Sequence, residues 1–488
     1  MVKLHLLATT ALAVLLPLSP VIAIETNLLT CLEDGQFEIG VDYFPDKYIP
    51  TKYDPIFLPA NQANLDDTTD YLEIDYFGYY KIVKNNFHNK SYLLYQCGAE
   101  PPQEEVNSGR HDLILPVPHK GGLAITQTPQ IPPLELLGLR EEIIAYIGDP
   151  QWVSSPCLRH RMDVDGSVEI VFDPEDPWNN DRTNELIAEF LQRNPEALIF
   201  TGPFSDGEGD RRIGAAASQE RTNVATFDWI AMYAALYNLE GLSNQIAQET
   251  EDRYTCTSSN AQILSSDMAE SERPTVLWAN YFQGYNWSVA ECRTWDESYY
   301  CEYAKHCGAN IISRPEGLGF NDKSIGDFWY LNDEEMLALG KDAEIWIYPS
   351  NTWETVYESK KEILDQFKSV QNKQVYDTQG GGENMWYEQR LAEYDVVAND
   401  FCELVGLSNP YQVPRHTVKW FRNVYTDPIP GPGTCNVPDE LDDRYVPVGA
   451  FCSPLAQTGG SGNGSGSGVS SLVCGQFIGI FVILALLL

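Results

Sequence analysis

Short apolar runs alternate with helix-like segments along most of the chain after Leu113, and this rhythm limits the possible folds more than any other feature. Runs such as Ala197 to Thr201 and Glu344 to Tyr348 have the length of strands, whereas Thr183 to Arg193 carries apolar residues at helical spacing. Strands that alternate with helices build parallel sheets covered by helices on both faces. We therefore expect an α/β fold with central parallel sheets. The remaining strands are expected at Leu123 to Thr126, Val168 to Phe172, Thr275 to Ala279, Asn310 to Ser313 and Gln374 to Tyr376.

One expected helix differs from the others because it is apolar nearly all round. Residues Ala225 to Glu251 contain no proline, and Gly241 is their only glycine. Such a helix must be buried on several sides, and at 1.5 Å per residue it spans about 40 Å. That length suits a bridge between two lobes, although periodicity alone fits an ordinary core helix equally well. The other helices are expected at Leu134 to Ile147, Glu297 to Lys305, Asp333 to Gly340, Glu354 to Gln371 and Met385 to Val405.

The region ahead of this alternation has a different character. Residues 24–68 are rich in Pro, Asp and Asn, which predicts an irregular lead-in. Polar and apolar residues then alternate over residues 71–76, and strand-like runs follow at Tyr79 to Val83 and Ser91 to Gln96. This pattern predicts an antiparallel hairpin unit before the parallel sheets.

The two ends of the chain predict export and attachment to a membrane lipid. Residues 1–23 contain an apolar run and close on Val21-Ile22-Ala23, which fits a signal-peptidase site. Small residues fill 459–471, and an uncharged apolar tail follows from Leu472 to Leu488. This order is typical of a GPI-anchor signal, with Asn463 as the expected attachment residue and 464–488 removed. A single transmembrane anchor is the alternative. The expected location is the extracellular face of the plasma membrane.

Cysteines and charge narrow the environment and the partners. Of the eleven cysteines, Cys474 lies in the tail, and the even number that remains predicts disulfides in an exported chain. Cys435 and Cys452 are placed to staple a C-terminal extension. Sequons at Asn89 and Asn286 predict glycosylation. A formal net charge of −38 makes nucleic acid and anionic lipid surfaces poor partners.

Motifs of catalysis are missing from the sequence. No serine fits the G-x-S-x-G pattern of hydrolases, and no glycine-rich segment matches a nucleotide or phosphate loop. Gly380 to Gly382 follows an expected strand, where it either receives a ligand backbone or forms a flexible loop. The histidines show no metal-ligand spacing. We therefore expect a protein that is not an enzyme and has no catalytic residue, resident cofactor or metal site.

Aromatic residues gather after the expected strands, where ligands bind in α/β sheets. Aromatic walls suit a bulky ligand with apolar faces, although the same residues can simply pack a core. The expected ligand-binding aromatics are Trp278, Tyr281, Tyr285, Trp287, Trp353, Trp386 and Tyr387. Arg221, just before the long helix, is the expected guanidinium donor to ligand oxygens, with Arg314 and Arg390 as further candidates. Surface salt bridges are the alternative role of these arginines.

The order of four segments resembles a known family. These segments are Ala197 to Gly202, Ser218 to Glu240, Asp342 to Ile347 and Val375 to Thr378. They resemble the helical-backbone (class III) periplasmic substrate-binding proteins for ferric siderophores, haem and cobalamin, and most of all algal cell-surface siderophore-iron-binding proteins. The resemblance covers about residues 90–425. It implies two α/β lobes, one long bridging helix and a ligand between the lobes.

The resemblance also implies a function and a division of the chain. It implies capture of an iron-siderophore complex, of the hydroxamate class, for iron uptake, with iron present only inside the bound siderophore. Cobalamin or haem binding is the alternative, and a surface enzyme is a weaker one. The transport partner is unknown. The implied parts are an N-terminal lobe (69–224), a bridging helix (225–251), a C-terminal lobe (252–430) and an extension with linker (431–463).

Overall fold

The computed structural model describes the central part of the chain. The described residues, which belong to one compact unit, are 24–51, 71–177, 179–204, 209, 211–282, 284, 286–293, 298–322 and 328–455. The expected signal peptide, the apolar tail and Asn463 lie outside them. Within these ranges, no helix combines the length and the apolar character that a membrane span requires.

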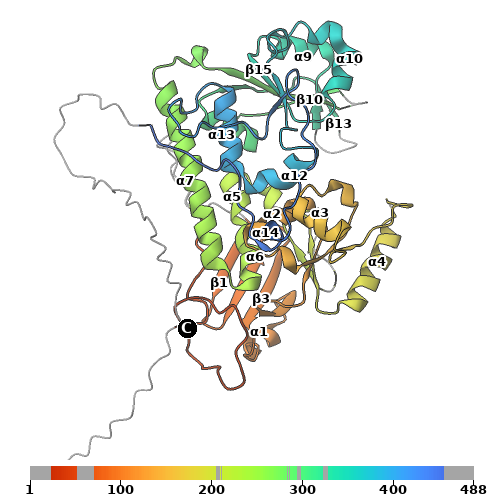
Figure 1. Cartoon of the computed structure of the whole chain (residues 1–488), viewed down its shortest axis with the longest axis vertical. Helices are drawn as coiled ribbons and strands as arrows, with labels where there is room; N and C mark the ends of the chain where they lie inside the picture. The colour runs from red at the N-terminus through yellow and green to blue at the C-terminus, as the bar shows by residue number, and fades with distance from the viewer. Residues whose placement is uncertain are drawn as a thin grey trace, which may run out of the picture. The chain divides into compact units, whose positions relative to one another are not determined.

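An all-parallel five-stranded sheet forms the first half of the α/β fold (Figure 1). All residues of its two central strands are buried, as expected for strands covered on both faces. Alternate residues face opposite sides: Ala124 and Ile199 pack with Phe190 of α4, whereas Leu123 and Phe200 belong to the larger core with α2 and α6. The strand order is β7 (Glu169–Ile170), β6 (Ile143–Tyr146), β5 (Leu123–Ile125), β8 (Leu198–Thr201) and β9 (Arg212–Gly214). The helices around it are α2 (Ile131–Leu136), α3 (Pro156–Asp163), α4 (Asn180–Arg193) and α6 (Ile230–Tyr237).

The predicted helix Leu134 to Ile147 is wrong. Helix α2 ends at Leu136, and Gly138 follows with a φ of 74°, a conformation that suits glycine at a helix end. The second part of the predicted helix is strand β6, whose Ile143 and Ala145 are fully buried in the sheet. A short apolar run fits either a buried strand or a buried helix, so periodicity could not separate the two.

A second, mixed sheet forms the other half of the fold. Its parallel strands run in the order β12, β10, β15 and β16, while β11 pairs antiparallel with the end of β10 and β17 pairs antiparallel with β16. The parallel sheets flanked by helices confirm the expected α/β class. The strands are β10 (Thr275–Phe282), β11 (Asn286–Val289), β12 (Asn310–Ile312), β15 (Ile345–Tyr348), β16 (Val375–Asp377) and β17 (Arg422–Asn423), with a separate hairpin of β13 (Phe320–Asp322) and β14 (Phe328–Tyr330).

The helices of this half partly differ from expectation. Helix α9 spans Asp333–Gly340 as predicted. Two predicted long helices, Glu354 to Gln371 and Met385 to Val405, are interrupted. The first is kinked at Lys360, which has a φ of −124°, and the second is broken at Glu393, which has a φ of −136°. The helices are α8 (Tyr299–His306), α10 (Trp353–Leu364), α11 (Lys368–Gln371), α12 (Met385–Gln389) and α13 (Tyr394–Leu404), with a 3-10 turn η6 (Arg390–Ala392) between the last two.

A four-stranded sheet precedes both halves and confirms the predicted hairpin unit. Strands β1, β2 and β3 are antiparallel, and β4 adds to β3 in parallel. The lead-in remains irregular over 24–51 and is tied to this sheet by the Cys31–Cys97 disulfide. Asn89 is exposed in the turn between β2 and β3, whereas Asn286 is half-buried. The elements are β1 (Leu72–Tyr76), β2 (Tyr80–Asn85), β3 (Lys90–Gln96), α1 (Gln103–Ser108) and β4 (Leu113–Val117).

The long bridging helix is present, but its bounds differ from 225–251. The chain forms α5 (Asn223–Asp228) and α6, and then α7, a helix of 26 residues from Glu240 to Ser265. Asn238 breaks the helix with a φ of 59°, and its side chain accepts a hydrogen bond from Lys81 Nζ at 3.0 Å. Near its start α7 pairs with the N-terminal sheet through Lys81 and Glu240, and farther along Tyr254 donates to Glu302 of α8 at 2.7 Å. Helix α7 therefore contacts both the N-terminal sheet and the second half of the fold (Figure 1).

Five disulfides join the ten cysteines of residues 24–455, which confirms the oxidised state predicted from the sequence. Cys435 bonds to Cys157 at the start of α3, and Cys452 bonds to Cys256 on α7. Both disulfides therefore attach the C-terminal extension covalently to helices of the fold, as expected. The other pairs are Cys31–Cys97, Cys292–Cys301 and Cys307–Cys402.

Candidate ligand-binding site

The carboxyl ends of the two parallel sheets meet around helix α12. In both sheets the connections change direction between central neighbours, β5 and β8 in one and β10 and β15 in the other. Ligands of α/β sheets bind beyond the strand ends at such points. Helix α12 follows β16 and contacts both α2 and the 3-10 turn η1 (Thr128–Gln130), the elements that follow β5. The geometry therefore places one candidate site at α12.

Hydrogen bonds join α12 to the loop that follows β6. The Glu388 carboxylate accepts from the backbone N–H groups of Ser154 and Ser155, each at 2.7 Å. Asn384, just before α12, donates to the Gln151 carbonyl at 3.4 Å. Burial raises the pKa of Glu388 to about 8, and the neighbouring Glu135 carboxylate adds to the rise, while the Ser154 N–H opposes it. The buried side chain of Glu388 therefore links α12 of the second half to the loop after β6 of the first half.

Arg390 is the principal charged group of this region that has no acidic partner. Its guanidinium carbon lies 3.8 Å from the centroid of the Tyr299 ring and 5.3 Å from the Trp386 ring. Its Nε is buried without a hydrogen-bond partner, and no carboxylate of the described ranges forms an ion pair with it. In a chain with a net charge of −38, a guanidinium left without an anion is available to one from outside.

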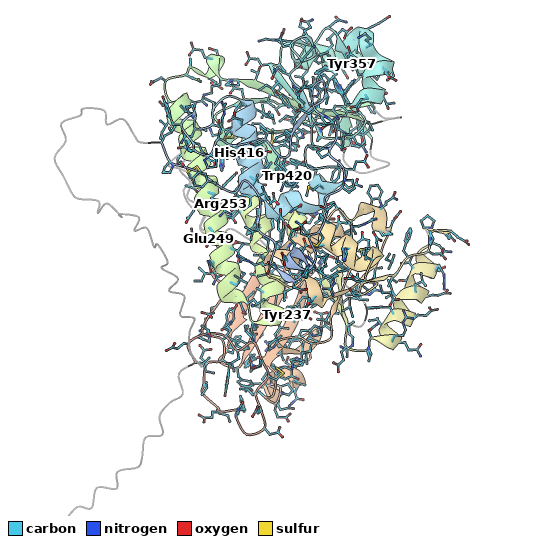
Figure 2. All side chains as sticks on the ribbon, in the orientation of Figure 1. Tyr237, Glu249, Arg253, Tyr357, His416 and Trp420 are labelled. Atoms are coloured by element: carbon cyan, nitrogen blue, oxygen red, sulfur yellow. A yellow bond between two sulfur atoms is a disulfide. The ribbon has the colours of Figure 1, made fainter. Side chains whose placement is uncertain are left out.

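Aromatic rings form the wall behind Arg390. Trp386 lies 6.2 Å from Trp278, which stacks on Tyr300 at 5.2 Å. Trp420, whose position is labelled in Figure 2, is fully buried and lies 6.0 Å from Trp386. Trp278 and Trp386 are themselves only 4% and 3% exposed. In this structure both rings pack beneath the surface behind Arg390 and do not present open faces to a ligand.

Tyr387 and Trp152 provide the exposed aromatic surface. Tyr387 is 59% exposed on α12, and its hydroxyl donates to the Pro349 carbonyl at the end of β15, at 3.3 Å. Trp152 is 51% exposed in the 3-10 turn Pro150–Trp152 that follows β6. The contact between Asn384 and Gln151 brings these two segments together. We call the group of Trp152, Tyr299, Trp386, Tyr387 and Arg390 the α12 site.

Trp152 was missed by the sequence reasoning, and the reason is clear. It stands one turn after a buried strand, where a strand-end aromatic should be noticed. Because the sequence pattern predicts a helix over β6, it predicts no strand end before Trp152. Phe204, 90% exposed just after β8, was missed although its strand was predicted.

Two predicted ligand-binding tryptophans are core residues in the structure. Trp287 is fully buried, packs 5.6 Å from Trp346 and donates its indole N–H to Asp333 at 2.7 Å. Trp353 is 2% exposed and packs 5.3 Å from the same Trp346 ring. The core-packing interpretation therefore describes both in this structure. Tyr281 is half-buried against Trp287. Tyr285 lies outside the described residues.

The three candidate arginines, Arg221, Arg314 and Arg390, also differ in burial and in their partners. Arg314 is 3% exposed, donates to Glu291 at 2.9 Å and also donates to two backbone carbonyls, so its role is structural. Arg221 is exposed in the turn before α5, and α5 contacts η6, which begins with Arg390. Of the three arginines, Arg390 has the geometry of a ligand donor.

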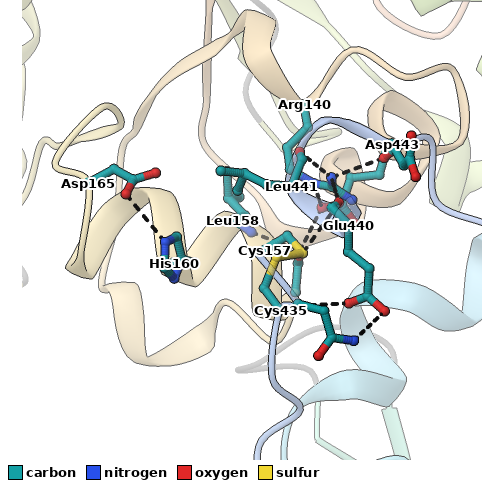
Figure 3. The surroundings of a disulfide bond; sticks show 12 residues. Arg140, Cys157, Leu158, His160, Asp165, Cys435, Glu440, Leu441 and Asp443 are labelled. Carbon is teal, nitrogen blue, oxygen red and sulfur yellow. Dashed lines mark hydrogen bonds and ion pairs between the residues drawn. A yellow bond between two sulfur atoms is a disulfide. The ribbon is translucent and has the colours of Figure 1, made fainter. Parts of the chain in front are cut away.

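Within the glycine run 380–382, Gly380 and Gly381 allow close packing of the chain. A Cβ atom at Gly380 would lie 2.3 Å from the Lys419 carbonyl oxygen, so no side chain fits there. Among the residues that the structure describes, the group that could hold a metal consists of Cys157, Cys435 and Glu440. Its two sulfurs form a disulfide (Figure 3), and a disulfide offers no thiolate to a metal.

Comparisons with known proteins find remote similarities. No family model matches the chain. An uncharacterized lipoprotein of Methanocaldococcus jannaschii is 24% identical over 200 residues, which is 38% of this chain, and the chain spans only 43% of that protein.

Similar solved structures are periplasmic binding proteins, the class that the sequence resembles. One, from Veillonella parvula, has a TM-score of 0.42 at 12% identity and covers 60% of this chain and 93% of its own. The periplasmic heme-binding protein HutB of Vibrio cholerae has a TM-score of 0.38 at 13% identity, with 57% and 98% covered. The vitamin B12-binding protein BtuF of the same organism has a TM-score of 0.37 at 12% identity, with 59% and 97% covered. Similarity at these levels assigns no ligand to this chain.

Proposed function

We propose that the protein captures a bulky, oxygen-rich ligand at the α12 site, and that this ligand is an iron-siderophore complex of the hydroxamate class. The observation that carries the proposal is the Arg390 guanidinium, which lies over two aromatic rings and has no carboxylate partner among the described residues. The protein would act as a binding component of iron uptake.

The chemistry of the site suits such a ligand. A guanidinium offers several N–H donors in a planar fork, which matches clustered oxygens. A ferric hydroxamate presents oxygens around the metal and apolar linkers at its edge. The exposed rings of Trp152 and Tyr387 offer apolar surface for those linkers. The iron would remain inside the siderophore and need no ligand from the protein.

The location is part of the proposal. Five disulfides support an exported protein, because such bonds persist in oxidising compartments. Attachment of a glycolipid at Asn463 would keep the protein on the outer face of the plasma membrane. Treatment of intact cells with a phosphatidylinositol-specific phospholipase tests this point, since the protein should then appear in the medium.

Titration of the purified protein with a ferric trihydroxamate tests the ligand. We expect saturable quenching of tryptophan fluorescence. An Arg390→Gln variant should bind about 10- to 100-fold more weakly, because a hydrogen bond to a charged group contributes about 1.5–3 kcal/mol. Arg110→Gln is the matched control, because Arg110 is an exposed residue between α1 and β4 and pairs with Glu105.

Two results would contradict the proposal. Tight binding of cobalamin or haem without any binding of the ferric trihydroxamate would assign the site to the alternative ligands. Equal affinities of the wild type and the Arg390→Gln variant for the ferric trihydroxamate would show that the ligand binds elsewhere.

A further inference from the structure

The C-terminal strap, which we define as residues 434–455, crosses several parts of the fold. It is bonded to α3 through Cys157–Cys435 and to α7 through Cys256–Cys452. Between these disulfides, Arg140 donates to the carbonyls of Glu440 and Leu441, each at 2.8 Å, and of Asp443 at 3.2 Å (Figure 3). The strap includes one short helix, α14 (Asp439–Asp442).

A cavity of about 560 Å³ lies beneath the strap. This volume is in the range of small-molecule sites. The strap supplies much of the cavity wall. The cavity therefore depends on the two disulfides that hold the strap against the fold. We call it the strap cavity. The other wall residues come from the loop before α3, from α12 and from the segment before β17, and those used below are Pro156, Met385, Gln389 and Lys419.

The strap cavity is separate from the α12 site although both use the same short helix. Met385 and Gln389 are four residues apart on α12 and therefore lie on one face of it. Trp386 is the residue after Met385 and therefore lies on a different face of α12, and Arg390 begins η6 directly after α12; both contact Tyr299. A ligand in the strap cavity would therefore contact Met385 and Gln389, whereas a ligand at the α12 site would contact Tyr387 and Arg390.

The buried polar side chains of the cavity wall already have partners. Glu135 accepts from Arg140 Nε and from Ser155 Oγ, both at 2.6 Å. Gln389 donates to Glu393 at 2.8 Å, and Lys419 donates to the same carboxylate at 2.6 Å. A charged ligand would find no unpaired charge of opposite sign on this buried part of the wall. Burial of such a ligand would therefore be costly.

The apolar side chains of the wall, in contrast, are left open. Val446 and Val448 line the cavity and are 64% and 74% exposed, and Met385, which also lines it, is half-buried. Pro156 and the Cys157–Cys435 disulfide extend this apolar surface. Contiguous exposed apolar surface is a feature of ligand-binding grooves.

We propose that the strap cavity binds a neutral, largely apolar small molecule, independently of the ligand at the α12 site. The apolar walls would lose contact with water around this molecule, while the paired charges beneath them would stay paired. Asp443 and Arg444 are exposed at the cavity wall and would leave a polar rim around its mouth. The strap is the lid of this second site.

A neutral fluorescent probe, N-phenyl-1-naphthylamine, tests the proposal on the purified full-length protein. Its fluorescence should rise saturably with one probe per protein. Val448→Glu places an unpaired charge in the apolar wall and should weaken probe binding at least about 10-fold. Val413→Glu is the matched control, because Val413 is also highly exposed, at 80%, and does not line the cavity. Val446→Glu provides a second test of the same wall.

Each outcome of this test bears on the proposal. Loss of probe binding in both wall variants, with wild-type affinity in Val413→Glu and Arg390→Gln, supports a separate strap site. Absence of saturable binding to the wild type overturns it. Loss in Arg390→Gln without loss in Val448→Glu also overturns it, because the probe would then bind at the α12 site. Thermal unfolding of each variant must match the wild type, and a variant that fails this check is replaced by Val446→Ser or Val448→Ser, for which a smaller loss of affinity is expected.

Discussion

Replacement of Glu388 by glutamine should remove part of the loss of folding stability that the protein shows as the pH rises. Glu388 is 1% exposed on α12, and its carboxylate lies between the backbone N–H groups of Ser154 and Ser155. Burial, the largest cause, raises its pKa from 4.5 to about 8. Glutamine has nearly the same shape and remains neutral at every pH.

The sign and the size of the effect follow from the two pKa values. Between pH 4.5 and about pH 8 the folded protein holds a proton on Glu388 that the unfolded chain has released. Stability from this group is therefore complete below pH 4.5 and is lost as the pH rises to about 8. At about 1.4 kcal/mol per pH unit, the loss is at most about 5 kcal/mol. The Glu388→Gln variant should not show this loss.

Chemical denaturation at pH 5 and pH 8.5 measures the difference. We expect the variant to gain about 2–5 kcal/mol over the wild type at pH 8.5 relative to pH 5. Glu104→Gln, on the exposed helix α1, is the control and should leave the difference unchanged. Glu251 also has a pKa of about 8 because it is buried, so the variant should retain part of the pH dependence. If Glu388→Gln destabilises the protein equally at both pH values, the carboxylate is ionised in the folded state and the burial argument is wrong.

Two further substitutions test the core and the buried ion pair. Trp287→Ala should lower the free energy of unfolding by about 3–5 kcal/mol, because the ring is fully buried against Trp346; a normal unfolding curve combined with weaker ligand binding would instead restore its predicted ligand role. Lys81→Met should cost about 3–5 kcal/mol, because it leaves the fully buried Glu240 without its cation. The double variant Lys81→Met/Glu240→Leu should recover part of this loss in the same denaturation assay, and no recovery would show that the Lys81 stem matters more than its charge.

Strands that are buried on both faces could be predicted from the sequence because their apolar runs are continuous. Ala197 to Thr201 was expected as a strand and forms β8. The break of the long helix at Asn238 could not be predicted, since it depends on contacts with Lys81 and with the Leu28 carbonyl, both far away in the sequence. Local pattern carries no information about such partners.

The candidate site was predictable only in part. The rule that aromatic residues after strands line ligand sites found Trp386 and Tyr387 and led to the region of α12. The same rule also selected Trp287 and Trp353, because an aromatic ring near a strand end can instead turn inward and pack in the core, as both do against Trp346 of β15. Which way it turns depends on the partners, here Trp346 and Asp333. The candidate arginine Arg390 stood out only when the structure showed which arginines have acidic partners.

The disulfide pattern also decides what a protease can release from the protein. Any single cut of the backbone between Cys157 and Cys435 leaves two pieces joined by the bond between these residues. A cut between Cys435 and Cys452 is spanned by Cys256–Cys452, and a cut between Cys31 and Cys97 is spanned by their own bond. From Cys31 to Cys452, only the stretch between Cys97 and Cys157 lacks such a bond. Elsewhere in that range, a nicked protein remains one covalent molecule.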